Sequence, residues 1–247
     1  MPGSPTVELP DLGPQRLFAG PGRSALRCGA AGPMRGLTVL AVEDSRFACE
    51  ALRLMCQRSG ARLRRAETLA AARAHLRLYR PDVVIVDLGL PDGRGEGLIR
   101  DLVLSLGRPA VILGTSGATA GRAAALAAGA DGYLDKPVES LAVFQQALLG
   151  IGPPQGEAGS DVPAPDPLAL RDDLARAAEG LATDPDAGMQ RYLAGFVHGL
   201  ARMARDPGLA AAAEGCAAPG AGVEGLQRVI AARLAVVSAG CGAGVGR

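Results

Sequence analysis

The sequence is poor in aromatic residues and in lysine. It contains no tryptophan and only 3% aromatic residues, which argues against stacking platforms for single-stranded nucleic acid. The formal net charge is +1, so no overall field attracts nucleic acid or an anionic membrane. Among 26 basic residues the only lysine is Lys136, in the segment DGYLDKPVE. Because an ammonium group is a compact point charge and a guanidinium group is a broad planar fork, this lone lysine indicates a buried anion.

Cysteine pairs and long apolar runs are also missing. Five cysteines without CxxC spacing favour a reduced cytoplasmic protein over a disulfide-stabilised one or a zinc site. No apolar run reaches the length of a transmembrane helix, and the N-terminus has no basic segment before an apolar core. We therefore expect no membrane partner and no secretion. The Ala-, Gly- and Arg-rich composition is typical of a bacterial protein from a GC-rich genome.

The chain divides into five regions by composition. Residues 1–35 are rich in Gly and Pro without periodicity and predict a disordered tail. Residues 36–150 alternate short apolar runs with helical patterns, and residues 151–167 form a Pro/Gly/acidic linker. Residues 168–238 show helical patterns only, and residues 239–247 predict a disordered end.

The second region predicts an α/β fold. Strand-like segments at 37–42, 62–67, 82–88, 110–114 and 132–135 alternate with helical patterns at 45–58, 68–78, 95–105, 119–128 and 138–149. Five strands alternating with five helices predict a doubly wound parallel sheet covered on both faces. The fourth region predicts a small all-α bundle, with helices over 168–183, 187–205, 207–215 and 223–238.

Polar residues gather where the predicted strands end. They are Glu43 and Asp44, Asp87, Thr115 and Ser116, and Lys136. The carboxyl ends of parallel strands meet at one edge of a sheet, so three carboxylates come close together there. Their repulsion is relieved by a hard divalent cation such as Mg²⁺. A carboxylate in such a site can accept a phosphoryl group, whose oxygens then need an ammonium and a hydroxyl donor.

Residues 37–149 resemble the receiver domain of bacterial two-component response regulators, a flavodoxin-like fold. The motifs that carry the resemblance are VEDS, VIVDLGLPDGRG, GTSGA and GADGYLDKPV, in the order and spacing of that family. The resemblance implies that Asp87 is the phosphoacceptor, and that Mg²⁺ is held by Glu43, Asp44, Asp87 and the Gly89 carbonyl. It further implies that Thr115 is the switch hydroxyl, that Lys136 pairs with the phosphoryl group and that Tyr133 is the switch aromatic residue. Pro137 would follow a cis peptide bond.

One departure from the family pattern concerns the switch hydroxyl. In VILGTSG a glycine precedes the hydroxyl residues, so that both Thr115 and Ser116 are candidates, and the spacing to Lys136 favours Thr115. Gly89 and Gly117 have no side chain at positions where the family tunes the lifetime of the phosphoryl group. The resemblance implies no enzymatic activity beyond self-phosphorylation from small donors and self-dephosphorylation.

The helical region has no basic cluster. Residues 151–247 hold eight arginines against eleven acidic residues, so we do not expect nucleic acid as a partner. In the helix over 187–205, an apolar stripe predicts bundle core; it comprises Met189, Tyr192, Leu193, Phe196, Val197, Leu200 and Met203. His198 falls almost opposite, hence exposed, with Arg191, Arg202 and Arg205. The segment HGLARMA shares the H-x-L start of histidine-phosphotransfer domains but lacks their Lys and Gly, so a surface histidine is the favoured interpretation. The other interpretation is a degenerate phosphotransfer-like bundle without an active histidine, which would serve as a docking or dimerisation surface.

The sequence thus predicts a response regulator that is phosphorylated on Asp87. The phosphodonor would be a sensor histidine kinase or a histidine-phosphotransfer protein, and the output would be protein–protein interaction through the receiver face and the helical domain, with a homodimer as one form. Two alternatives stay open. One is a phosphorelay intermediate with transfer through His198, and the other is a DNA-binding transcriptional regulator.

Overall fold

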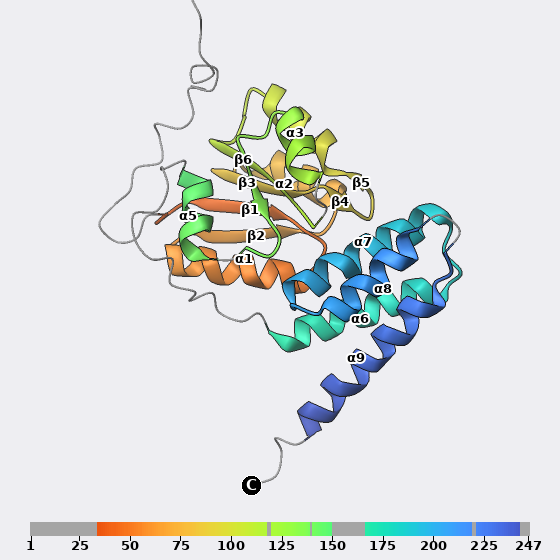
Figure 1. The fold of residues 1–247 in the computed structure, drawn as a ribbon. Helices are drawn as coiled ribbons and strands as arrows, with labels where there is room; N and C mark the ends of the chain where they lie inside the picture. The colour runs from red at the N-terminus through yellow and green to blue at the C-terminus, as the bar shows by residue number, and fades with distance from the viewer. Residues whose placement is uncertain (1–33, 118–119, 139, 150–165, 219–220, 243–247) are drawn as a thin grey trace, which may run out of the picture.

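The structure, a computed structural model, describes residues 34–117, 120–138, 140–149, 166–218 and 221–242. A sheet flanked by helices is followed by a bundle of helices (Figure 1). Most of the predicted tail, linker and C-terminal end lies outside the described residues. Met34, placed in the tail by its sequence context, is fully buried under the sheet, and its backbone N–H donates to the Ser59 carbonyl at 3.1 Å. The packed part of the chain therefore includes Met34.

The sheet has five parallel strands in the order β2-β1-β3-β6-β7. Their bounds are β1 Thr38–Val42, β2 Arg62–Ala66, β3 Val83–Asp87, β6 Val111–Ser116 and β7 Gly132–Asp135. The order steps from β1 outward in both directions, which confirms the doubly wound fold. A small antiparallel hairpin, β4 (Gly89–Leu90) with β5 (Gly93–Arg94), follows β3. Its strands of two residues are too short to leave a periodic pattern in the sequence.

Helices cover both faces of the sheet (Figure 1). On one face lie α1 (Arg46–Ser59) and α5 (Leu141–Leu149), and on the other lie α2 (Leu69–Leu78), α3 (Gly95–Leu104) and α4 (Gly121–Ala127). Strand residues alternate between the two cores: Val39 packs with α1 and α5, whereas Leu40 packs with the opposite layer. This double coverage explains why the inner strands β1, β3 and β6 read as nearly continuous apolar runs, whereas the edge strand β2 carries arginines.

The C-terminal region is helical, as predicted. It comprises α6 (Pro167–Ala182), α7 (Ala187–Met203), α8 (Pro207–Ala217) and α9 (Glu224–Gly242). Aspartates cap the first three of these helices: Asp166, Asp186 and Asp206 each accept backbone N–H bonds of the first turn. The bundle has its own core of leucine, alanine, valine and isoleucine side chains. Among the described residues, no helix combines the length and the apolar character that crossing a membrane requires.

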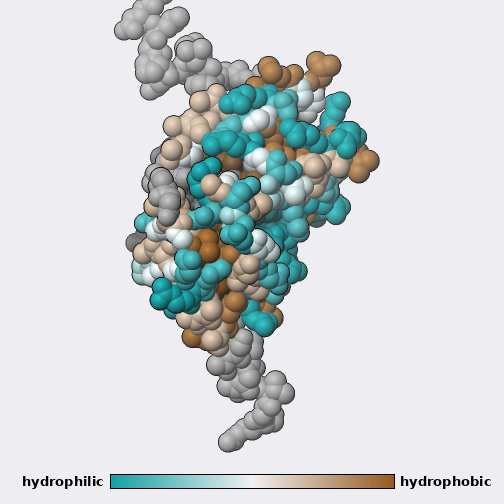
Figure 2. Space-filling model, turned by 90° about the vertical axis from the view of Figure 1, so that its right-hand side faces the viewer, coloured by the Kyte–Doolittle hydropathy of each residue, from teal (hydrophilic) through white to brown (hydrophobic). Residues whose placement is uncertain are grey.

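The bundle packs directly on the sheet domain, against the end where α1 begins (Figure 1). Phe47, in the first turn of α1, is 4% exposed and belongs to the core of the bundle rather than to that of the sheet domain. The space-filling view shows apolar and polar residues intermingled on a surface that continues from one domain to the other (Figure 2). The two domains therefore share a packed interface in this structure.

Candidate functional site

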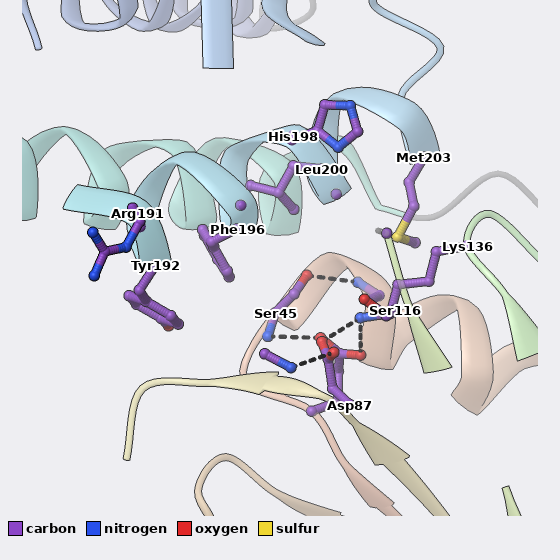
Figure 3. A pocket seen from close by; sticks show the side chains of 16 residues that line it. Ser45, Asp87, Ser116, Lys136, Arg191, Tyr192, Phe196, His198, Leu200 and Met203 are labelled. Carbon is purple, nitrogen blue, oxygen red and sulfur yellow. Dashed lines mark hydrogen bonds and ion pairs between the residues drawn. The ribbon is translucent and has the colours of Figure 1, made fainter. Parts of the chain in front are cut away.

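The strand ends bring the predicted polar residues together. Glu43 and Asp44 follow β1, Asp87 is the last residue of β3, and Lys136 follows β7. The Lys136 ammonium lies 2.5 Å from Asp87 Oδ2 and 2.6 Å from Glu43 Oε2. All four side chains are buried. The lone lysine of the chain thus lies between two carboxylates of a buried acidic cluster (Figure 3).

The acidic cluster has the chemistry of a divalent-cation site. Glu43, Asp44 and Asp87 each offer an oxygen, and these oxygens lie within 4.8 Å of one another. Asp44 Oδ1 is buried and has no hydrogen-bond partner among the described residues. Glu43 Oε2 likewise accepts no hydrogen bond there, but it is ion-paired with Lys136. Because Mg²⁺ binds a few carboxylate oxygens and keeps waters, these residues fit that ion.

Burial and mutual repulsion shift the ionisation of the cluster. Burial is the largest influence and raises the pKa of Glu43 to about 8, although Lys136 opposes the shift. Burial also raises the pKa of Asp44. Burial by itself would lower the pKa of Lys136, but the charges of Asp87 and Glu43 outweigh it and raise that pKa, so Lys136 stays charged. Two side-chain cations lie beside the acids, Lys136 and the Arg176 guanidinium, which is 3.7 Å from Asp44 Oδ2, and the unpartnered Asp44 Oδ1 stays available to a bound cation.

The neighbouring backbone and hydroxyl groups complete the site. The Gly89 N–H donates to Asp87 Oδ1 at 3.0 Å, and Gly89 lies beside the cavity above Asp87. The Thr115 hydroxyl, by contrast, donates to the Leu134 carbonyl at 2.9 Å, within the sheet. Ser116, the other hydroxyl candidate, lines the cavity. The two candidates thus occupy different positions, one bound to β7 and one at the cavity wall.

Tyr133 is already inside the protein. Its hydroxyl donates to the Ser116 carbonyl at 3.1 Å, and the Arg122 guanidinium lies 5.2 Å from the centre of its ring. Tyr133 therefore contacts the segment that carries the hydroxyl candidates.

The peptide bond between Lys136 and Pro137 is cis, as the family resemblance implies.

The helical bundle supplies residues to this site, and sequence reasoning missed them. The Tyr192 hydroxyl, from α7, donates a hydrogen bond to Asp44 Oδ2. The Arg176 guanidinium, from α6, donates to the Asp44 carbonyl at 2.9 Å. The apolar stripe of α7 predicted Tyr192 in the bundle core, on the basis of its ring alone. Its hydroxyl was the available signal, because a buried phenol needs a polar partner.

A cavity of about 220 Å³ lies between α7 and the strand ends. Asp87, Lys136 and Ser116 form its floor, and Tyr192, Phe196 and Met203 point toward them from α7 (Figure 3). Asp87 is only 7% exposed. The acidic cluster is thus covered by the bundle.

His198 does not occupy the outer position that the helical wheel predicted. Its side chain is 23% exposed, and its Nε2 lies 3.1 Å from Glu214 Oε1 on α8. The physical reason is that α8 packs beside α7 and brings Glu214 next to the His198 ring, which a wheel of α7 alone does not contain. Arg202 is exposed, as predicted, and it also donates to the Gly117 carbonyl of the sheet domain at 3.0 Å. The His198 ring points away from Asp87 (Figure 3).

Comparison with known proteins gives a family for the sheet domain. Residues 39–147 match the family model of the response regulator receiver domain. The KDP operon transcriptional regulatory protein KdpE of Escherichia coli is 37% identical over 142 residues, covering 55% of this chain and 58% of KdpE. The virulence transcriptional regulatory protein PhoP of Salmonella typhimurium is 35% identical over 116 residues, covering 46% of this chain and 52% of PhoP. The chain thus spans little more than half the length of these curated relatives.

Solved structures align over the same part of the chain. A CheY-like response regulator receiver domain from Methylobacillus flagellatus is 26% identical with a TM-score of 0.41, covering 45% of this chain and 98% of its own. The chemotaxis response regulator CheY4 of Vibrio cholerae is 25% identical with a TM-score of 0.39, covering 46% and 93%. Together with the family match and the sheet topology described above, the site geometry leads to one conclusion: residues 39–147 of this chain are a response regulator receiver domain.

Proposed function

We propose that this chain is a response regulator that accepts a phosphoryl group on Asp87 from a sensor histidine kinase or a histidine-phosphotransfer protein. The observation that carries the proposal is the placement of Asp87. It ends a buried strand inside a cluster of three carboxylates, and its Oδ2 lies 2.5 Å from the ammonium of Lys136. That set matches what a phosphorylated aspartate requires.

The transfer would proceed in one displacement. A carboxylate oxygen of Asp87 attacks phosphorus, and the phosphorus–nitrogen bond of the donor phosphohistidine breaks as the new phosphorus–oxygen bond forms. The imidazole keeps the electron pair of the broken bond and regains a proton from solvent. Lys136, now paired with the Asp87 carboxylate, would follow the charge to a phosphoryl oxygen. Thr115 or Ser116 would donate a hydroxyl hydrogen bond to another.

The acidic cluster has a distinct part in this chemistry. Glu43, Asp44, Asp87 and the Gly89 carbonyl would hold Mg²⁺, which supplies positive charge against the carboxylates and the incoming phosphoryl oxygens. The Gly89 N–H orients Asp87 through its bond to Oδ1, and so leaves Oδ2 on the side of Lys136. The unpartnered Asp44 Oδ1 supports this assignment.

The output would be a change in protein–protein contacts. The helical region carries fewer arginines than acidic residues, which disfavours a phosphate-binding surface. The curated relatives are named transcriptional regulatory proteins, so a role in transcription stays an alternative for this chain. Duplex binding measured over a salt series would detect it, since binding through phosphates weakens steeply with salt.

The phosphoacceptor can be tested with a small acyl phosphate as donor and Mg²⁺ present. We expect Asp87→Ala to lose the label and Asp135→Asn to keep it. Asp135 is the matched control because it also ends a strand, but it faces outward in an ion pair with Arg122. A third variant, His198→Ala, is expected to label like the unaltered chain. Loss of label in His198→Ala would favour the relay alternative, and label surviving in Asp87→Ala would refute the proposal.

A further inference from the structure

The helical bundle covers the site at which the phosphoryl group would arrive. Helix α7 passes over Asp87, with Tyr192, Phe196 and Met203 directed at the strand ends (Figure 3). The backbone of α7 comes close as well: a Cβ added to Gly117 would lie 3.2 Å from the Cα of Gly199. This approach leaves no space for another polypeptide between α7 and Gly117, which directly follows β6.

The cover is fixed by a buried aspartate of α6. Asp173 is 1% exposed and accepts three bonds from the first residues of α1: from the Ser45 hydroxyl at 2.9 Å, and from the N–H groups of Arg46 at 3.1 Å and Phe47 at 3.0 Å. A carboxylate at a helix N-terminus is favourably placed for the unpaired N–H groups and the helix dipole. Asp173 therefore joins the bundle to the residues that directly follow the acidic pair.

A second group of contacts joins the bundle to the acidic pair itself. Tyr192 donates to Asp44 Oδ2, and Arg176 donates to the Asp44 carbonyl. Arg202 holds the Gly117 carbonyl on the other side of the cavity. All of these contacts are polar, in contrast with the apolar anchor at Phe47. Polar contacts across an interface can be exchanged for water at a smaller cost than apolar ones, so this interface can open.

The size of the cavity decides what can reach Asp87 while the cover is in place. Its volume of about 220 Å³ is below the roughly 300 Å³ at which pockets for drug-sized ligands begin. A small acyl phosphate fits such a space. A phosphohistidine does not, because it is attached to a protein that would have to occupy the position of α7.

We propose that α6 and α7 form a displaceable cover that admits small phosphodonors to Asp87 and excludes protein phosphodonors until it moves. This inference rests on the proposed function of Asp87. In either case the phosphorus–oxygen bond to Asp87 forms as the donor bond breaks, and the leaving acetate or imidazole takes the electron pair. Because coupling is reciprocal, a protein donor that docks on this face must also weaken the contacts of the bundle with α1.

The cover can be opened by one substitution in the full-length chain. We expect Asp173→Ala to accept the phosphoryl group from an autophosphorylated histidine-kinase domain at least tenfold faster than the unaltered chain. Labelling from acetyl phosphate should change less than twofold. Asp172→Ala is the matched control, because Asp172 is the neighbouring acid on α6 and makes only an exposed ion pair with Arg46.

A second readout does not depend on phosphorylation. Hydrogen exchange of the Phe47 amide should speed up in Asp173→Ala and stay unchanged in Asp172→Ala, since only Asp173 accepts that N–H. Arg202→Ala, at an exposed position, is the milder opening variant if Asp173→Ala fails to fold, and it should also speed up transfer from the kinase domain.

Three results would overturn the inference. If the kinase domain phosphorylates the unaltered chain and the opened variant at equal rates, the bundle is not a barrier. The same conclusion follows if acetyl phosphate labels the opened variant but the kinase domain transfers nothing to it. No labelling of Asp87 from acetyl phosphate in any chain would instead refute the proposed function, and the cover with it.

Discussion

At the scale of single residues, Lys136 shows why this chain uses lysine once. Its ammonium contacts two carboxylates, Asp87 and Glu43, at the floor of a narrow cavity. The composition of the chain makes arginine the ordinary choice, yet a planar guanidinium would need room for five donors beside these two acids. The need for a compact positive charge could be predicted from the sequence. That its partners are Asp87 and Glu43 follows from the strand order, which brings the ends of β1, β3 and β7 together.

We predict that Lys136→Arg keeps the fold but weakens the response to phosphorylation. The positive charge beside Asp87 and Glu43 is retained, but the broader group cannot move from Asp87 to a phosphoryl oxygen in the same space. The measurement is hydrogen exchange of the Phe47 amide with and without acetyl phosphate, alongside circular dichroism for the fold. Arg122→Lys, in an exposed pair with Asp135, is the control and should respond normally. A normal response in Lys136→Arg would contradict this account of the lone lysine.

At the scale of elements, the glycine in VILGTSG has a packing role in β6. A Cβ added to Gly114 would lie 2.4 Å from the Cβ of Ala125, so α4 packs on the strand at a distance that only glycine permits. The sequence marked Gly114 as a departure from the family pattern but gave no reason for it. The reason lies in a contact between residues eleven positions apart, which no local pattern encodes.

We predict that Gly114→Ala lowers the free energy of unfolding by about 1–3 kcal/mol, because α4 must move away from the sheet. Gly97→Ala in α3 is the matched control. An added Cβ there meets no atom within 4 Å, and alanine favours a helix, so it should stabilise the chain by about 1 kcal/mol or less. Urea unfolding of both variants checks the pair. Equal free energies of unfolding for Gly114→Ala and Gly97→Ala would show that α4 can move away from β6 at no cost.

The start of α8 gives a prediction that depends on pH. Asp206 accepts the Leu209 N–H and two bonds from Arg233 on α9, and the bond from Arg233 lowers the pKa of Asp206. A lowered pKa in the folded state adds stability above the ordinary value of 3.8, and this stability is lost as the pH falls through the folded value. We expect Asp206→Ala to lower the free energy of unfolding by about 1 kcal/mol near neutral pH, and by less in acid. If the stability difference between Asp206→Ala and the unaltered chain became larger as the pH falls, this account of Asp206 would be wrong.

Element positions were predictable because local signals agree with the fold. Ser45 and Thr68 cap α1 and α2, and the predicted strand segments become strands within two residues of their predicted bounds. The alternation of strands and helices then specified the edge at which Glu43, Asp87 and Lys136 meet. The hydroxyl positions were less predictable, since Thr115 bonds to Leu134 in the sheet whereas Ser116 faces the cavity.

At the scale of the whole molecule, the docking of the bundle was not predictable. The stripe on α7 was assigned to one core, although its residues divide between two surfaces: Val197 packs inside the bundle, and Tyr192 reaches the acidic cluster. The helical wheel contains no information about a second domain. Asp173 shows the same limit, because an acid inside a helix reads as a solvated residue until α1 supplies the N–H groups that it accepts.

Phe47 is the apolar anchor between the two domains, and this leads to the last prediction. It is anchored in α1 but buried among Leu174, Val197 and other residues of the bundle core. We expect Phe47→Ala to cost about 3–5 kcal/mol and to separate one unfolding transition into two, because the remaining contacts between the domains are mostly polar. Calorimetry measures both effects. Phe144→Ala is the control, since Phe144 is fully buried inside the receiver domain, and it should destabilise that domain without uncoupling the bundle. If Phe47→Ala still unfolds in one transition, the polar contacts around Asp173 and Asp44 are sufficient to hold the cover in place, and the opening proposed for α6 and α7 would have to break them first.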